Sequence, residues 1–341
     1  MIFSKKLLKQ LLIFALLSIL IIYFLMLKSN VKENGRLLVS EKLEIDQIVD
    51  SADEYLQSPM TFKVALTLVS NLKTIKPGSY RLEKGMSNLT ILRVLIIGRQ
   101  SPIKLTFNNQ DTLEKLAGRI SSEMEFDSIS LLNEMKNTEF LKANGFNTET
   151  ALAIFVPNTY EIYWNTTPKK FIEKMLVEYH LFWNATRIEK AKSHQLTPLQ
   201  VQILASIVQK ETAYVSERPI VAGLYLNRLK AGWPLQADPT IVYAIKLKTN
   251  QDSVIKRVMK KHLLIESPYN TYQNTGLPPG LISMPDISSI EAVLNAPKHP
   301  YFYMCASTEK MGSHLFATTL GEHNRNAAKY QKWLNNQVEN P

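Results

Sequence analysis

The feature that most constrains this chain is an uncharged apolar segment near its N-terminus. Residues 11–27 carry no charge, and Ser18 and Tyr23 are the only polar side chains among them. At about 1.5 Å per residue, a helix of this length, extended by two leucines shortly before it, just crosses a bilayer core of about 30 Å. A cleavable signal peptide is the alternative, but its apolar part would be shorter and an A-x-A-like site should follow. The sequence therefore predicts an uncleaved membrane anchor at residues 1–30.

The charges beside this segment predict its orientation. Lys5, Lys6 and Lys9 precede it, so the positive-inside rule places the N-terminus in the cytoplasm. No second apolar run of this length follows, so we expect the rest of the chain to face outward. The predicted location is the cell inner membrane, with a single pass through lipid at residues 11–27 and a periplasmic or otherwise extracytoplasmic remainder. The net charge of +10 suits an anionic partner but does not identify one.

The remainder predicts an α+β fold in two parts. Residues 28–36 are polar and are interpreted as a short linker. A small module at 31–108 combines helices and strands, whereas a larger domain at 109–341 is mainly helical and closes with a short β-hairpin. Residues 264–286 contain so many prolines and glycines that they predict an ordered loop or lid. The predicted helices are 45–56, 61–72, 86–97, 111–122, 128–144, 168–190, 198–213, 217–230, 287–296 and 321–337, and the predicted strands are 80–82, 103–107, 301–306 and 313–318.

One predicted helix carries a carboxylate on its apolar side. Thr197 is a good N-cap, Pro198 suits the first helical position, and Gln200 completes a capping box. With about 100° per residue, Glu211 points almost where the apolar stripe of this helix points. That stripe consists of Ile203, Leu204, Ile207 and Val208.

This placement has a chemical consequence for Glu211. Burial disfavours the charged form and raises the pKa of a carboxyl group. A carboxylic acid that is protonated near neutral pH can protonate the leaving group of a glycosidic bond. The alternative is a structural glutamate that pairs with an arginine or caps a neighbouring helix, and the periodicity alone does not exclude it.

Several motifs follow one another around Glu211. They are A-S-I-V-x-K-E-T at 205–212, N-R-L at 227–229, L-Q-x-D-P-T at 235–240, S-P-Y-N-T-Y at 267–272, G-L-P-P-G at 276–280 and G-S-H-x-F at 312–316. Together they resemble the endolytic murein transglycosylase family, also called MltG or YceG-like. The likeness extends over roughly 155–330 with its spacing intact, and the segment at 77–87 resembles the family's LysM-like module more weakly. One departure is Asn-Asn-Gln at 108–110, where the family usually has a Pro-Glu-Gly-type turn, and another is Gln209, often acidic in the family.

The resemblance implies cleavage of MurNAc-β-1,4-GlcNAc bonds within peptidoglycan glycan strands, with Glu211 as the catalytic acid and base. It implies 1,6-anhydro-MurNAc ends, a role in terminating nascent strands, and peptidoglycan synthases as further candidate partners. No cofactor and no metal are expected, because the six histidines are scattered and no metal-binding motif occurs. The candidate substrate-binding residues are Asn227, Gln236, Asp238, Tyr269, Asn270 and His314.

Other functions remain open at this stage. A non-catalytic peptidoglycan-binding scaffold would use the module at 31–108, and a water-using muramidase would need a second carboxylate, for which Asp238 is the candidate. A serine acyl-transfer enzyme would use the S-x-x-K sequence from Ser70 to Lys73, but the companion K-T-G motif is missing. Nucleic-acid binding is not expected, because the basic residues are dispersed and the chain is predicted to be exported.

Overall fold

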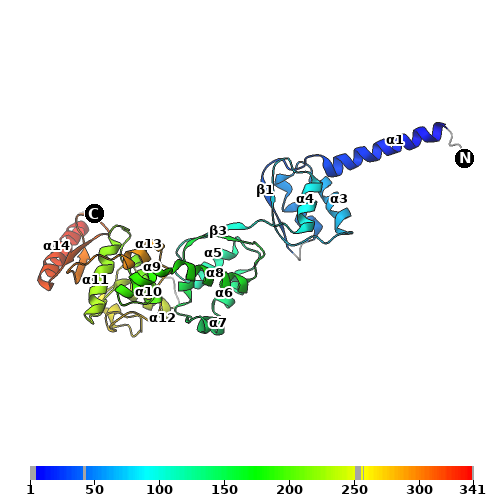
Figure 1. The fold of residues 1–341 in the computed structure, drawn as a ribbon. Coiled ribbons are helices and arrows are strands. Elements are labelled where there is room, and N and C mark those ends of the chain that lie inside the picture. The colour runs from blue at the N-terminus through cyan, green and yellow to red at the C-terminus, as the bar shows by residue number, and fades with distance from the viewer. Residues whose placement is uncertain (1–4, 41–43, 250–254, 256, 340–341) are drawn as a thin grey trace. The chain divides into compact units, whose positions relative to one another are not determined.

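The computed structural model describes residues 5–40, 44–249, 255 and 257–339 (Figure 1). The chain divides into two compact units that interleave along the sequence. The first unit holds Met1–Leu105, Ser121–Asp127 and Thr159–Thr167, and the second holds Thr106–Ile120, Ser128–Asn158 and Pro168–Pro341. The predicted α+β class is confirmed at the level of mixed helices and strands. Because the units interleave, the domains predicted at 1–30, 31–108 and 109–341 stay a prediction.

The first unit begins with the apolar helix and continues into a small helix-and-strand module. Among the described residues, one helix, Lys6–Leu27, is long and apolar enough to cross a membrane. The antiparallel strands β1 and β2 lie in register from Gly35 opposite Leu82 to Val39 opposite Gly78. The elements are α1 (Lys5–Ile22), the π-helix η1 (Tyr23–Leu27), β1 (Gly35–Val39), α2 (Ile45–Asp50), the 3-10 helix η2 (Asp53–Tyr55), α3 (Pro59–Ser70), β2 (Gly78–Leu82) and α4 (Asn88–Ile97).

Local sequence explains where the helices of this module begin and end. The Ser58 hydroxyl accepts a hydrogen bond from the third backbone N–H of α3, and the Ser87 hydroxyl does the same for α4. Gly98 ends α4 in the left-handed conformation, with a φ of 77°. Phe62, Leu66 and Leu92 belong to the core that these helices share with the sheet.

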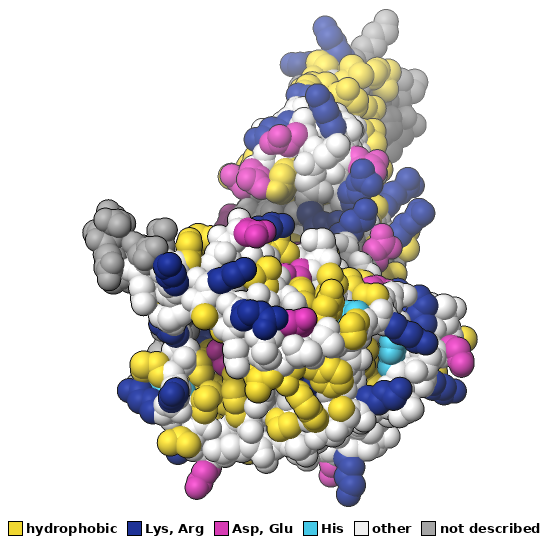
Figure 2. All heavy atoms as spheres, turned by 90° about the vertical axis from the view of Figure 1, so that its left-hand side faces the viewer, with side chains coloured by type: hydrophobic (Ala, Val, Ile, Leu, Met, Phe, Trp, Pro, Cys, Tyr) yellow, Lys and Arg dark blue, Asp and Glu magenta, His cyan; other side chains and the backbone are white. Residues whose placement is uncertain are grey.

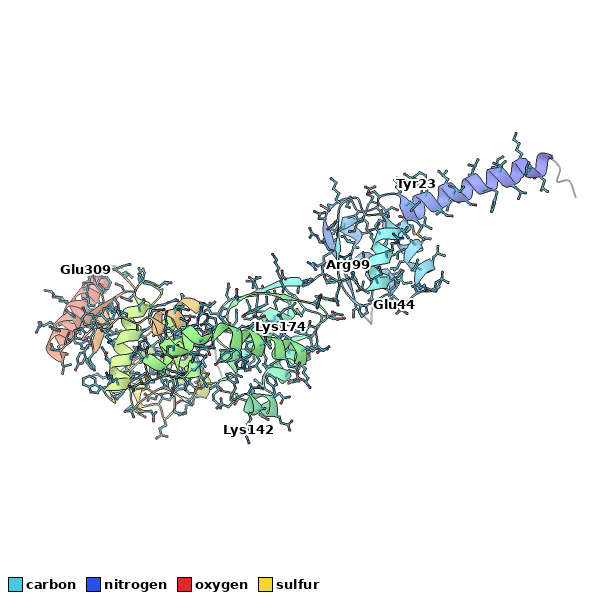
Figure 3. The ribbon with its side chains drawn as sticks, viewed as in Figure 1. Tyr23, Glu44, Arg99, Lys142, Lys174 and Glu309 are labelled. Atoms are coloured by element: carbon cyan, nitrogen blue, oxygen red, sulfur yellow. The ribbon has the colours of Figure 1, made fainter. Side chains whose placement is uncertain are left out.

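The predicted linker at 28–36 is wrong. Val31 is buried in the core of the module, and Asn30 is buried in a hydrogen-bond network. Gly35 and Arg36 already belong to β1. The segment is polar because its side chains bind the backbone of the module, so α1 joins the module without a flexible spacer. Figure 3 labels Tyr23, where α1 passes into η1 at this junction.

The second unit is mainly helical. The residues from 265 to 286 contain no helix or strand, which confirms the predicted loop. Strand β5 pairs antiparallel with β6 as the predicted closing hairpin. Strands β3 and β4, each of which holds residues assigned to both units, form a further two-stranded sheet. The remaining elements are β3 (Ile103–Phe107), α5 (Leu113–Ser121), α6 (Ser128–Met135), α7 (Thr138–Ala143), η3 (Ala151–Ile154), β4 (Asn158–Ile162), α8 (Pro168–Phe182), α9 (Ala185–Ser193), α10 (Pro198–Glu211), α11 (Arg218–Lys230), α12 (Asp238–Thr249), η4 (Lys260–Leu264), α13 (Ile287–Leu294), β5 (Tyr303–Ala306), β6 (His314–Ala317) and α14 (Leu320–Glu339).

Two helices predicted as continuous are each divided by an asparagine. Asn137 separates α6 from α7, and Asn184 separates α8 from α9. In both places the side-chain oxygen accepts hydrogen bonds from backbone N–H groups of the following helix, so it starts a new helix rather than continuing the old one. The sequence also missed the strands β1 and β4.

Candidate active site

Helix α10 is the centre of the second unit. The predicted capping box is confirmed, because Thr197 accepts a hydrogen bond from the Gln200 N–H while the Gln200 side chain accepts one from the Thr197 N–H. Every residue from Val201 to Gln209 is buried, so the helix is enclosed on all sides and not along one stripe as its apolar pattern suggested. Glu211 is the last residue of this helix, and it lines a cavity of about 980 Å³.

The cavity lies within the second unit, and three of the predicted site residues line it. These are Glu211, Asp238 and His314. Leu281 and Ile282 supply apolar wall from the proline- and glycine-rich loop. Figure 2 shows one face of the molecule, where apolar side chains gather between Lys and Arg side chains. The cavity therefore combines a carboxyl group on a buried helix with a partly apolar wall.

The Glu211 carboxyl group is poorly supplied with hydrogen bonds. Its Oε2 atom and the Tyr225 hydroxyl are both buried, and among the described residues neither has a hydrogen-bond partner of ordinary geometry. Burial raises the pKa of Glu211 from 4.5 to about 8. The neighbouring Tyr225 hydroxyl lowers this pKa, the negative charge of Asp238 raises it, and the positive charge of Arg228 lowers it. At neutral pH the group is therefore mainly a carboxylic acid.

Arg228 is close enough to influence Glu211, but its hydrogen bonds go to the backbone. Its Nε donates to the Phe302 carbonyl at 2.8 Å, and one terminal nitrogen donates to the Leu235 carbonyl at 2.6 Å. Burial lowers the pKa of Arg228. The arginine thus supplies a nearby positive charge without forming an ion pair that would keep Glu211 ionised. Its two hydrogen bonds also connect α11 to the segments that contain Leu235 and Phe302.

Asp238 is the acidic residue of the cavity wall whose charge acts on Glu211. It begins α12, and its Oδ1 accepts a hydrogen bond from the Tyr272 hydroxyl at 2.6 Å. Burial and the adjacent carboxylate raise the pKa of Tyr272, so this hydroxyl remains a donor. Gln236, two residues earlier, is exposed and has a φ of 50°, which is unusual for a residue other than glycine. It does not line the cavity, but its backbone N–H donates to the Thr271 carbonyl.

His314 is held by a carboxylate that the sequence did not reveal. The two carboxyl oxygens of Glu217 accept the backbone N–H of His314 at 2.7 Å and contact its Nδ1 at 3.1 Å. Burial raises the pKa of Glu217, but hydrogen bonds from Thr212 and His314 outweigh it and lower that pKa overall. Glu217 therefore fixes the position of His314 at the cavity wall.

Three predicted binding residues, Asn227, Tyr269 and Asn270, do not line the cavity but contact the segments around it. The side-chain amide of Asn227 donates to the carbonyls of His299 and Tyr301, and that of Asn270 donates to the carbonyls of Leu263 and Ile265. These NH2 groups hold the loops whose carbonyls they bind. That Asn227 and Asn270 also bind substrate stays a prediction. Tyr269 is buried, and its ring contacts that of Tyr243, which lines the cavity, at 4.8 Å between centroids.

Polar side chains of α10 bind the loop that forms the apolar wall. The Ser206 hydroxyl accepts the N–H of Ile282 at 3.2 Å, and the Gln209 side chain bonds to both Met284 and Asp286. Gly280 lies so close to the backbone of Glu149 that no side chain would fit there. Gln209 is therefore buried and holds the loop rather than facing solvent.

The other chemistries considered from the sequence find no assembled site. Ser70 donates its hydroxyl to the Thr67 carbonyl within α3, far along the chain from the cavity-lining residues. Among the residues that the structure describes, no three His, Cys, Asp or Glu side chains converge as a metal site. Tyr225 is a neighbour of Glu211 that sequence reasoning missed, although Val221, Leu224 and Tyr225 do follow the helical spacing of a buried face.

Comparison with known proteins agrees with this geometry. A family model described as the YceG-like family matches residues 37–329. The chain belongs to the YceG-like family. A protein of Bacillus subtilis (strain 168) named endolytic murein transglycosylase is 30% identical over 268 residues, covering 74% of this chain and 72% of that protein. A protein of the same name from Streptococcus pneumoniae (strain ATCC BAA-255 / R6) is 28% identical over 290 residues, covering 76% of this chain but 51% of the relative.

A solved structure of the YceG-like family has a similar fold. It is the 2.6 Å crystal structure of a putative yceG-like protein from Listeria monocytogenes, with a TM-score of 0.56 and 26% sequence identity. The match covers 86% of this chain and 98% of the Listeria chain. The similarity therefore extends over both units and not only over the segment around Glu211.

Proposed function

We propose that this chain is an endolytic murein transglycosylase, a lyase that cuts peptidoglycan glycan strands at MurNAc-β-1,4-GlcNAc bonds. The observation that carries the proposal is the Glu211 carboxyl group, which lines a large cavity while burial raises its pKa to about 8. Two of the relatives that resemble this chain bear the name of that activity. An acid that stays protonated at neutral pH meets the first need of glycosidic bond cleavage.

In the first step, Glu211 donates its proton to the glycosidic oxygen. The bond between C1 of MurNAc and that oxygen breaks, the bonding electrons go to the leaving GlcNAc oxygen, and C1 becomes electron-poor. Glu211 is left as a carboxylate. The Tyr225 hydroxyl and the positive charge of Arg228 both lower the pKa of Glu211, so they stabilise this ionised form while it exists.

In the second step, the Glu211 carboxylate removes the proton from the C6 hydroxyl of the same MurNAc. The C6 oxygen then bonds to C1 and closes a 1,6-anhydro ring, which restores the protonated acid. Because nucleophile and electrophile belong to one sugar, the reaction gains the effective concentration of an intramolecular step and needs no bound water. One carboxyl group can therefore perform both proton transfers.

We further propose that α1 anchors the protein in the cell inner membrane, with the N-terminus in the cytoplasm and the catalytic unit outside. Lys6–Leu27 has the length and hydropathy for this role. In this position the enzyme would reach nascent glycan strands and end their growth, with peptidoglycan synthases as neighbours. The small module of the first unit is proposed as LysM-like and as a second contact with glycan.

A water-using muramidase is the second candidate, because Asp238 lines the same cavity and acts electrostatically on Glu211. In that mechanism Asp238 would activate water or attack C1, and the product would carry a reducing MurNAc end. The Tyr272 hydroxyl donates to Oδ1 of Asp238 at 2.6 Å and so occupies one oxygen of that carboxylate, which leaves less of it open to a water and supports the transglycosylase instead.

The products of purified full-length protein distinguish these functions. We expect mass spectrometry of digested glycan strands to show 1,6-anhydro ends with the wild type and none with Glu211→Gln. Glu173→Gln, a change of an exposed carboxylate on α8, is the matched control and should cleave normally. Reducing ends would support the muramidase, and absence of cleavage by folded wild type would support a binding scaffold. Undiminished anhydro ends from Glu211→Gln would remove Glu211 from the mechanism.

A further inference from the structure

Helix α3 presents an apolar face to solvent as well as to the core. Phe62, Ala65 and Leu66 are fully buried on its inner side. On its outer side, large apolar side chains recur at every fourth position, which places them in one row along the helix. The row consists of Met60, Val64 and Leu68, with exposed fractions of 69%, 42% and 51%, and it is extended by Leu72, which lies in the turn just after α3 and is 80% exposed. Soluble surfaces seldom display such a row without a partner.

Helix α3 lies beside the end of the apolar N-terminal helix. Both α3 and α4 pack against η1, the continuation of α1. The sheet of the module packs instead against α2 and α4. Figure 1 shows α3 and α4 near the base of α1, with β1 on the far side of the same unit. The helix that carries the outer row is therefore a direct neighbour of the segment that enters the membrane.

The junction between η1 and the module is fixed by hydrogen bonds and packing. Leu25 and Met26 pack against the core of the module. The Asn88 side chain donates to the Leu25 carbonyl at 2.7 Å and accepts a hydrogen bond from the Asn30 side chain at 2.8 Å. Asn30 in turn binds the backbone of Ser58, the N-cap of α3, in both directions. The start of α3 is thus tied to the end of the membrane helix.

The length of the free apolar helix favours close approach of the module to lipid. Since Leu25 and Met26 are engaged by the module, the uncharged part left to enter lipid runs from Leu11 to Phe24. At about 1.5 Å per residue it is roughly 21 Å long, which is shorter than a hydrocarbon core of about 30 Å. A short span is accommodated by drawing its flanking residues into the interface, and here the flank is the module itself.

The charge around the row suits an anionic lipid surface. Helix α3 contains no acidic residue. Lys28, directly after η1, and Lys73, directly after Leu72, are exposed at the two ends of this region. Interfacial helices combine an apolar face with flanking Lys or Arg side chains in this way, because the apolar side chains enter the acyl boundary while the ammonium groups meet phosphate.

We propose that the outer row of α3, Met60, Val64, Leu68 and Leu72, docks on the outer leaflet of the same bilayer that α1 crosses. The occupant is the lipid surface, with phosphate head groups over Lys28 and Lys73. This rests on the membrane anchoring stated in the proposed function. Docking fixes the orientation of the module relative to the membrane, so the module does not swing freely about the end of α1.

Fluorescence quenching by lipid tests this docking on the full-length protein in vesicles that contain phosphatidylglycerol. Cys305 is the single cysteine, so Cys305→Ala gives a background for one new cysteine at a time. Leu68→Cys, labelled with an environment-sensitive dye, should lose fluorescence when the vesicles contain a lipid with a nitroxide near its head group. Arg81→Cys on β2, which is exposed, is the matched control and should keep its fluorescence. Leu16→Cys within α1, labelled in the same way, reports whether the span is inserted. Its dye should be quenched by a lipid whose nitroxide lies deeper in the bilayer.

Each pattern of quenching decides the proposal. Quenching at position 68 and 16 but not at 81 supports docking. Quenching at 16 alone overturns docking and leaves the anchor intact, and absence of quenching at 16 overturns both. If the dye at position 68 shifts to shorter wavelength only as protein concentration rises, without lipid quenching, the row binds a second copy and the proposal is wrong. Cleavage of glycan strands by the same variants reports separately on the proposed activity.

Discussion

Glu211→Gln should stabilise the fold while it removes activity, and the gain should depend on pH. Burial holds the pKa of Glu211 at about 8, against 4.5 for an ordinary glutamate. Below about pH 4.5 the carboxyl group is protonated in both the folded and the unfolded chain, so pH has no effect through it. Between pH 4.5 and pH 8 the Glu211 carboxyl group is ionised in the unfolded chain but stays protonated in the folded chain. Unfolding therefore releases a proton, and the free energy of unfolding falls as pH rises.

The size of this effect follows from the two pKa values. One pKa unit corresponds to about 1.36 kcal/mol, so the full shift costs the wild type almost 5 kcal/mol at high pH. Between roughly pH 5 and pH 8 the loss amounts to about 3.5 kcal/mol. For a unit of this size 1 kcal/mol changes Tm by about 2–4 °C. Glutamine does not ionise, so the Tm of Glu211→Gln should move away from that of the wild type by roughly 7–14 °C over this range.

Scanning calorimetry of the full-length protein in detergent at several pH values measures this difference on the transition of the second unit. Glu173→Gln is the control, and because its side chain lies in solvent its Tm should follow that of the wild type at every pH. A Tm difference between Glu211→Gln and wild type that stays constant from pH 5 to pH 8 would refute the reasoning. It would mean that Glu211 ionises as freely in the folded protein as in the unfolded chain.

Three further outcomes are expected. Asp238→Asn removes a negative charge that raises the pKa of Glu211, so the alkaline limb of the kcat–pH profile should move to lower pH. An unmoved limb would mean that the charge of Asp238 does not influence the ionisation of Glu211. Arg228→Met leaves two buried carbonyl groups unpaired and should lower the free energy of unfolding by about 2–4 kcal/mol, measured by urea denaturation. Asn270→Ala releases two backbone carbonyls of the adjoining loop, and hydrogen exchange should become faster there; unchanged exchange would contradict its loop-holding role.

Local sequence determined the features that depend on one or two turns of chain. The apolar composition of residues 11–27 determined a helix that is long and apolar enough to cross a membrane, and the Thr197 and Gln200 pair determined where α10 begins. The same local pattern placed Glu211 at the end of that helix. Such features are readable because caps and periodicity involve neighbours in the chain, so no distant partner is needed to create them.

Tertiary structure alone decided which groups surround Glu211 and which residues only support them. Glu217 and His314 are 97 positions apart, and no local pattern predicts that they bind. Asn227 and Asn270 looked equally suited to bind sugar, but folding places backbone carbonyls against their amides. The reason is physical: a polar side chain is directed by whatever unpaired group folding brings near it, and that group comes from another part of the chain. The local sequence therefore determined that Glu211 lies at the end of α10. The packing of distant segments determined the pKa of its carboxyl group and the residues around it.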